Sequence, residues 1–183
     1  MALIKSICVY CGSREGNLLQ YQMAAIALGK LLAQNDITLV YGGGHVGLMG
    51  ILADSVLQNN GKVIGVIPKA LYEKELAHLE ITELLIVDNM HQRKQKMADL
   101  SDAFIALPGG IGTLEELMEI LTWTQLGFHK KPIAVLNVAN YYDLLLQFFE
   151  FMIEQKFLPR ENFRLSVGES PQDVLQQIQQ ATK

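Results

Sequence analysis

The sequence contains no apolar run near the ~18 to 20 residues that are needed to cross a bilayer, and its 183 residues carry a net charge of −4. The N-terminal stretch MALIKSICVYC lacks a long apolar region and a small-residue cleavage site, so it predicts a strand rather than a signal peptide. Nucleic-acid-binding domains usually show a basic footprint, which is missing here. We therefore expect a cytoplasmic protein that binds neither membranes nor nucleic acids.

Cysteine is scarce: Cys8 and Cys11 are the only two. Two are too few for a self-contained structural zinc site. A redox CxxC pair sits at a helix N-terminus, where the dipole lowers a thiol pKa, whereas Cys8 lies inside an apolar run. We expect both to be buried and reduced. The histidines, which show neither HxH nor HExxH spacing, are His45, His78, His91 and His129. We expect no metal site.

The sequence does have the composition of a folded globular protein, with 50% hydrophobic and 19% charged residues. Short apolar runs alternate with longer stretches of helical spacing. The runs are 4–10, 37–41, 63–67, 81–87, 103–107, 133–136 and, weakly, 163–167. This alternation predicts one α/β domain over residues 1–183, with a three-layer, doubly wound, Rossmann-like fold and a mainly parallel sheet of about seven strands.

Two apolar stripes at helical spacing accompany these runs. The first consists of Tyr21, Ala25, Leu28 and Leu32. The second lies in the stretch 144–152 and contains Leu144, Phe148, Phe149, Phe151 and Met152. We interpret the first as the core face of a helix and the second as core or as a subunit interface.

Glycine-rich or charged segments follow four of the predicted strands. They are CGSREGN (11–17), YGGGHVGLMG (41–50), DNMHQRK (88–94) and PGGIGTLEE (108–116). Ligands of doubly wound sheets bind outside the carboxyl ends of the strands. These four segments are therefore expected to meet in one ligand site.

The segment 41–50 satisfies the GxGxxG spacing of dinucleotide-binding proteins. That fingerprint also needs an acidic residue at the end of the next strand, where this chain has Val66-Ile67-Pro68-Lys69. No Gly-Lys-Ser/Thr follows the glycines, so a P-loop is excluded as well. The loop still suits a ligand that approaches backbone amides at a helix N-terminus.

In PGGIGTLEE, Thr113 and Glu116 have the spacing of a capping box, in which each side chain would satisfy the other's backbone amide. A capping box accounts for those two residues without any chemistry. It does not account for Gly109, Gly110 and Gly112 together, since one glycine serves a turn. Backbone approach to an anion is the simplest reason for three glycines, and a catalytic Glu116 stays open beside the cap.

Arg93, Lys94 and Lys96 fall early in a predicted helix. Such a cluster is usually a solvated basic face. However, cations in a first helical turn oppose the macrodipole, and a bound phosphate would offset that cost. Phosphate binding and a solvated face both remain open from the residues alone.

Taken in order, these motifs resemble those of the LONELY GUY (LOG) family of cytokinin riboside 5′-monophosphate phosphoribohydrolases, many of which have been mislabelled lysine decarboxylases. MHQRK and PGGIGTLEE carry the resemblance, and CGSREGNLLQY, YGGGHVGLMG, VIGVIPKAL and LTWTQLGFHKKPIAVLN extend it over about residues 7–140. The resemblance implies a homodimer without a cofactor that hydrolyses the N-glycosidic bond of adenosine 5′-monophosphate (AMP) or an N6-modified relative.

The resemblance also implies roles for individual residues. The catalytic pair would be Arg93 and Glu116. The substrate-binding residues would be Gly12, Ser13, Gly43, Gly44, Glu75, Met90, Lys94, Gly109, Gly110, Ile111, Gly112, Thr113, Leu114, Glu115 and Thr122. The chain departs from the pattern at His45, where the family usually has a small residue, and at Arg14, where serine is common.

Two other functions compete with hydrolysis. Anion-binding loops do not by themselves imply turnover, so the same scaffold could serve as a non-catalytic carrier of a nucleotide or phosphorylated cofactor. A decarboxylase dependent on pyridoxal phosphate would need a Schiff-base lysine and a partner for the pyridinium nitrogen, and the sequence marks neither.

Overall fold

The structure is a computed structural model that describes residues 4–72 and 77–181. Its strands are β1 (Ser6–Tyr10), β2 (Thr38–Tyr41), β3 (Val63–Pro68), β4 (Glu83–Val87), β5 (Ala103–Ala106), β6 (Ile133–Leu136) and β7 (Ser166–Gly168). Its α-helices are α1 (Leu19–Gln34), α2 (Gly47–Gln58), α3 (Lys69–Tyr72), α4 (Met90–Asp99), α5 (Ile111–Gln125), α6 (Asp143–Glu154) and α7 (Pro171–Ala181). Two short 3₁₀ turns, η1 (Val138–Asn140) and η2 (Arg160–Asn162), complete the described elements.

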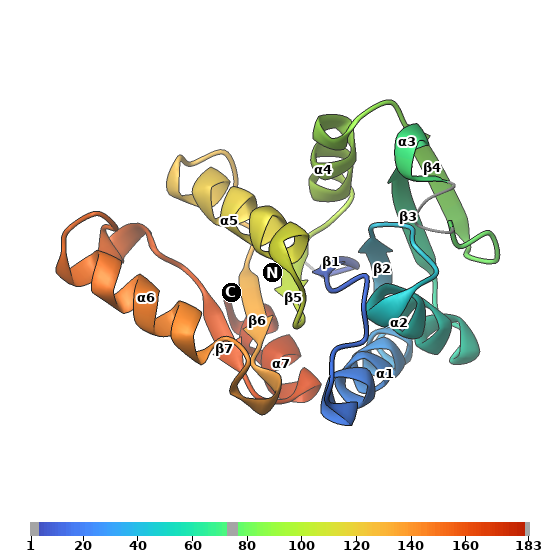
Figure 1. Cartoon of the computed structure of the whole chain (residues 1–183), viewed down its shortest axis with the longest axis horizontal. Helices are drawn as coiled ribbons and strands as arrows, with labels where there is room; N and C mark the ends of the chain where they lie inside the picture. Colours follow the sequence, from blue (N-terminus) through green and yellow to red (C-terminus); the bar gives the residue numbers. More distant parts are fainter. Residues whose placement is uncertain (1–3, 73–76, 182–183) are drawn as a thin grey trace.

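All strand pairs in the sheet are parallel, and the strand order is β4-β3-β2-β1-β5-β6-β7. The chain builds outward from β1 to β4 and then returns to place β5 on the other side of β1. The sheet therefore has a topological switch point between β1 and β5, where the following loops diverge to opposite faces and leave a crevice. In Figure 1 the carboxyl ends of the strands face the viewer.

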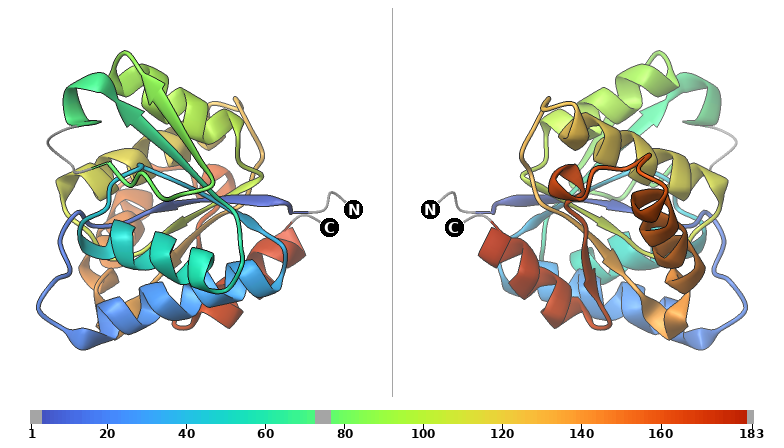
Figure 2. Two further views of the ribbon diagram at one scale, coloured as in Figure 1. Left: turned by 90° about the vertical axis from the view of Figure 1, so that its right-hand side faces the viewer. Right: turned by 90° about the vertical axis from the view of Figure 1, so that its left-hand side faces the viewer.

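Helices cover both faces of the sheet, as the side views show (Figure 2). One hydrophobic cluster joins α1, α2 and α7 to one face, and it includes Ile7, Leu28, Leu52 and Ile178. A second joins α4, α5 and α6 to the other face, and it includes Met97, Phe104, Leu117 and Tyr142. Strand residues alternate between the two clusters, which is why these short strands read as continuous apolar runs.

Each of the seven apolar runs overlaps a strand, the weak last run only at Ser166 and Val167, so the predicted three-layer α/β fold is confirmed. The first apolar stripe is buried along α1, as expected. In α6 only Phe149 of the second stripe is buried, whereas Leu144, Phe148 and Phe151 are exposed. The core interpretation therefore holds for one side chain, and the subunit interface stays a prediction. No helix among the described residues is long and apolar enough to span a membrane.

Cys8 and Cys11 are free and buried, as the sequence predicts. Cys8 lies inside β1 and Cys11 follows it immediately. Burial, and next the negative charge of Glu116, raises the pKa of both thiols. A raised thiol pKa keeps the sulfur protonated, and a protonated sulfur is a poor nucleophile.

We expect the native protein to be inert to a thiol reagent such as dithiobis-nitrobenzoate at pH 8, because neither buried sulfur forms thiolate. After unfolding in guanidinium chloride, both cysteines should react. Absorbance of the released thiolate measures this directly. Fast reaction of either cysteine before denaturation would show that the described burial is wrong.

Candidate active site

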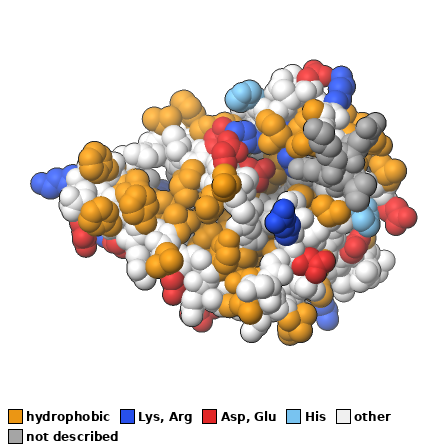
Figure 3. Space-filling model, in the orientation of Figure 1, with side chains coloured by type: hydrophobic (Ala, Val, Ile, Leu, Met, Phe, Trp, Pro, Cys, Tyr) orange, Lys and Arg blue, Asp and Glu red, His pale blue; other side chains and the backbone are white. Residues whose placement is uncertain are grey.

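A cavity of about 730 Å³ opens at the carboxyl edge of the sheet, beside the switch point. Its wall comes from the loop after β1, the start of α2, the first turn of α4, and the segment from Pro108 into the first turns of α5. Figure 3 views this edge from outside and shows acidic and basic side chains gathered near the middle, among hydrophobic ones. The volume falls within the ~300–1,000 Å³ that is typical of small-molecule sites.

Backbone hydrogen bonds lock three of these segments together. The Gly12 amide donates to the Pro108 carbonyl at 3.1 Å, and the Gly12 carbonyl accepts from the Leu48 amide at 3.0 Å. A side chain at Gly12 would press on the Gly109 backbone, and one at Gly109 would overlap the Thr113 hydroxyl. Gly12 and Gly109 are therefore required for close packing of the loops, not for ligand access.

Helix α5 begins at Ile111, with Gly110 as its N-cap and no side-chain cap among the described residues. The predicted capping box is therefore wrong: Thr113 lies inside the first turn, buried against Gly109. Because the helix starts three residues earlier than predicted, the amides of residues 111–113 have no intrahelical acceptor. They belong to residues that line the cavity.

Gly110 and Gly112 face open space: apart from their own neighbouring stretch of chain, no described atom lies within 4 Å of the position that a Cβ atom would take. Neighbouring Ile111 is 86% exposed. Packing in the described part of the chain therefore does not require glycine at either position. The open backbone and the uncapped helix start together form a surface that suits an anion.

Arg93 also lines the cavity and is only 5% exposed. Its Nε donates to the Val66 carbonyl at 3.1 Å, and its Nη2 donates to the Gly42 carbonyl at 2.7 Å. A side chain at Gly42 would overlap Nη2, so the glycine admits the guanidinium. The N-cap Asn89, whose side chain accepts from the Gln92 amide at 2.9 Å, fixes the turn that carries Arg93.

Lys94 is also buried, but it lies between α4 and α5 instead of in the cavity wall. Its Nζ donates to Glu115 and, at 3.1 Å, forms an ion pair with Glu119. Burial lowers the pKa of the Lys94 ammonium, but the hydrogen bonds and charges of the two carboxylates outweigh it and hold the pKa above its ordinary value. A solvated basic face is thus the wrong interpretation for Arg93 and Lys94, and it holds only for exposed Lys96.

Glu116 is half-buried in α5 and lines the cavity. After burial itself, its charge is the main cause that raises the pKa of the Cys8 and Cys11 thiols, and it also raises the pKa of the Tyr10 phenol. Arg93 acts on Cys8 in the opposite direction. The charges of Glu116 and Arg93 therefore both reach side chains of β1, and both residues line the cavity beside it.

The structure brings together most of the residues that the sequence singles out. Those that line the cavity are Gly12, Ser13, Met90, Arg93, Gly109, Gly110, Ile111, Gly112, Thr113, Glu115 and Glu116. Those that lie outside its wall are Gly43, Gly44, Lys94, Leu114 and Thr122. Leu114 packs against the second hydrophobic cluster, and the Thr122 hydroxyl donates to the Met118 carbonyl at 2.7 Å. Glu75 lies outside the described residues.

Two tyrosines that no sequence motif marks, Tyr141 and Tyr142, follow β6 and hold the segment before α5. The Tyr142 hydroxyl donates to the Leu107 carbonyl at 2.6 Å, and the Tyr141 hydroxyl donates to the Gly109 carbonyl. Tyr141 also lines the cavity and meets Tyr21 edge-on, with ring centroids 5.7 Å apart. The rule that ligand-site segments follow strands applies to residues 137–142 too and is the signal that could have found them.

Comparison with known proteins places the chain in a family. The family model described as "Possible lysine decarboxylase" matches residues 49–178. A probable cytokinin riboside 5′-monophosphate phosphoribohydrolase of Oryza sativa subsp. japonica is 47% identical over 98% of this chain and 74% of that protein. A cytokinin riboside 5′-monophosphate phosphoribohydrolase of Arabidopsis thaliana is 53% identical over 84% of this chain and 72% of that protein. The chain therefore belongs to the LOG family.

More distant solved structures share the fold. A molybdenum cofactor binding protein from Rippkaea orientalis superposes with a TM-score of 0.72 at 22% identity, covering 97% of both chains. The molybdenum cofactor carrier protein of Chlamydomonas reinhardtii gives 0.71 at 19% identity, covering 97% of both chains. At such identities the likeness extends to the Rossmann-like fold alone.

Substitution by alanine should change the free energy of unfolding in opposite directions at Gly42, which is tightly packed, and at Gly112, which faces open space. Gly42→Ala should cost about 1–3 kcal/mol of unfolding free energy, because its methyl group would displace a buried guanidinium. Gly112→Ala should instead add about 0.5–1 kcal/mol, because alanine favours a helix and meets open space. Urea unfolding followed by circular dichroism measures both. A Gly112→Ala variant as destabilised as Gly42→Ala would contradict the assignment.

Proposed function

We propose that this member of the LOG family hydrolyses the N-glycosidic bond of AMP or an N6-modified AMP, releasing the purine base and ribose 5-phosphate. The observation that carries the proposal is the placement of Glu116, Arg93 and the open N-terminus of α5 in one cavity. The names of the relatives support the same reaction.

The 5′-phosphate is proposed to bind at the start of α5. Residues 111–113 supply amides without intrahelical acceptors, and Gly110 and Gly112 let an anion reach them. Arg93 adds a positive charge to the lining of the same cavity. Two backbone carbonyls already hold its side chain, so it loses little further entropy on binding. Binding energy from the phosphate then positions the ribose, which is the part that reacts.

Glu116 is proposed to act on the ribose. Cleavage of an N-glycosidic bond passes through a ribose with oxocarbenium character, which a nearby carboxylate stabilises. The same carboxylate can accept a proton from the attacking water. Glu116 lines the cavity and lies about one helical turn along α5 from the proposed phosphate site. No step in this scheme requires a metal ion or an organic cofactor.

The base is proposed to lie against the apolar part of the wall. Tyr21 and Tyr141 supply aromatic surface, and Leu48 and Met49 supply aliphatic surface. Such a wall suits a planar purine, whose ring faces are apolar and stack on aromatic side chains. Gly43, Gly44, Lys94, Leu114 and Thr122 lie outside this wall, so any contribution from them is proposed to act through the residues that they support.

A decarboxylase dependent on pyridoxal phosphate, as the description of the family model suggests, finds no support in the cavity. That chemistry needs a lysine to form a Schiff base with the cofactor. None of the described residues that line the cavity is a lysine. Lys94, the one buried lysine among the described residues, donates a hydrogen bond to Glu115 and forms an ion pair with Glu119.

We further propose a homodimer that works in the cytoplasm. Exposed Leu144, Phe148 and Phe151 on α6 provide an apolar surface that a second copy can cover. The two free, buried cysteines are compatible with a reducing compartment.

Replacing Glu116 tests the catalytic assignment. Glu116→Gln keeps the shape of the side chain but removes its charge and basicity, so adenine release from AMP should fall by about 10²–10⁴-fold. Chromatography of free adenine measures the rate. Glu119→Gln is the matched control, because Glu119 lies in the same helix outside the cavity wall, and it should stay within a few-fold of the parent. Native-rate hydrolysis by Glu116→Gln would refute the role.

The phosphate assignment is tested by the substrate. Adenosine should be cleaved with a kcat/KM at least about 100-fold below that of AMP, since two charge-assisted hydrogen bonds of ~1.5 kcal/mol each would be lost. Steady-state release of adenine from both compounds measures the ratio. Equal rates would place the phosphate outside the site, and binding of AMP without adenine release would favour a carrier.

A further inference from the structure

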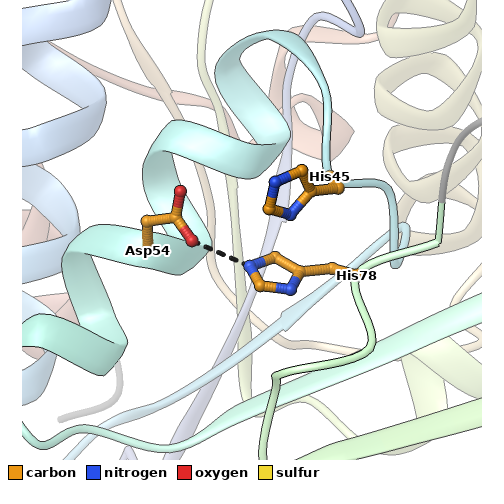
Figure 4. Close-up of side chains that lie close together, drawn as sticks. All are labelled: His45, Asp54 and His78. Atoms are coloured by element: carbon orange, nitrogen blue, oxygen red, sulfur yellow. Dashed lines mark hydrogen bonds and ion pairs between the residues drawn. The ribbon is translucent and has the colours of Figure 1, made fainter.

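Outside the cavity, three side chains with metal-binding atoms converge from separate parts of the chain. His45 lies in the loop between β2 and α2, Asp54 lies within α2, and His78 lies just before β4. Each offers one ligand atom, and these atoms all lie within 4.8 Å of one another. Figure 4 shows the three side chains pointing toward one another from the loop, the helix and the segment before β4. None of the three belongs to the cavity wall.

His78 is the fixed member of the cluster. Its side chain is 1% exposed, its Nε2 lies 2.8 Å from Asp54 Oδ1, and its backbone amide donates to the Gly43 carbonyl at 2.9 Å. Its Nδ1 is buried and has no hydrogen-bond partner among the described residues. Without a metal, Nε2 donates its proton to the Asp54 carboxylate. Because no described group donates to Nδ1, the ring proton can move to Nδ1 when a metal ion takes the Nε2 lone pair.

His45 completes the set from the solvent side. Its ring meets the His78 ring edge-on, with centroids 4.3 Å apart, and it is exposed. The hydrogen bond between His78 and Asp54 is a sufficient structural reason for those two side chains. It does not account for the second imidazole, His45, in contact with the His78 ring. Two histidines and a carboxylate are, in contrast, a common ligand set of zinc.

We propose that His45, Asp54 and His78 bind one divalent transition-metal ion, with Zn²⁺ as the preferred ion. Bonds of about 2.0–2.1 Å in a tetrahedral site place ligand atoms ~3.3 Å apart. The widest pair must therefore close by at most about 1.5 Å, which rotation of the exposed His45 and the 43%-exposed Asp54 can supply. The exposed side leaves the fourth position to water.

The ion would cross-link three segments of the chain next to the candidate active site. It would tie the glycine loop after β2 to α2 and to the segment before β4, which already meet through the Gly43–His78 hydrogen bond and the bridge between Gly44 and Ala77. The same loop carries the Gly42 carbonyl that holds Arg93. The spacing rules for histidine pairs could not find this site, because its ligands come from different elements.

Metal binding is measured by titrating protein freed of metal by a chelator with Zn²⁺ in a calorimeter. The parent should bind one equivalent, and Zn²⁺ should raise its melting temperature. His45→Ser and Asp54→Asn should each weaken binding by at least about 100-fold, because losing a direct ligand costs more than losing a group that only orients one. Both replace exposed or half-exposed side chains, so they should fold. His91→Gln, which removes an exposed histidine elsewhere, should bind as the parent does.

Cobalt gives an independent readout. Co²⁺ bound to the parent should show the intense visible bands of a four-coordinate ion, and His45→Ser should lose them. The proposal is overturned if the parent binds no equivalent of Zn²⁺, or if His45→Ser binds it as tightly as the parent. It stands apart from the proposed hydrolysis, because the metal titration is read without substrate.

Discussion

The buried guanidinium of Arg93 is the constraint on which the carboxyl edge of the sheet depends. A charge that is 5% exposed must be satisfied by partners, and the carbonyl oxygens of Val66 and Gly42 are two of them. Gly42 has to be glycine to let the side chain pass. The first turn of α4 has to start at Asn89 to aim it. The glycine loop, the end of β3 and α4 are thereby fixed relative to one another.

The glycines of the site divide into two groups once the packing is known. Positions 12, 42 and 109 require glycine because backbone or side-chain atoms of the protein occupy the space that a Cβ atom would take. Gly110 and Gly112 have no such neighbours among the described residues. Placed at the uncapped start of α5, they leave the helix N-terminus open. An anion there would be met by amide dipoles, and Arg93 adds a positive charge to the lining of the same cavity.

Much of this arrangement could be predicted from sequence, for physical reasons. Apolar runs define parallel strands because both faces are buried, and glycine-rich segments after the strands mark the edge where ligands bind. The start of α5 was wrongly predicted, because burial of Thr113 against Gly109 outweighs the cap that its hydroxyl could form. The pairing of Lys94 with two α5 glutamates, and the meeting of His45 with His78, depend on how distant elements pack, so no local pattern carries them.

The central claim is that the open glycines at the start of α5 admit the substrate's phosphate. Adenine release from AMP by Gly112→Ala, measured on protein whose stability has been determined in the same preparation, tests it most directly. We expect a protein at least as stable as the parent whose kcat/KM falls by about tenfold or more, the equivalent of ~1.4 kcal/mol of lost transition-state binding. A stable variant with unchanged kcat/KM would contradict it.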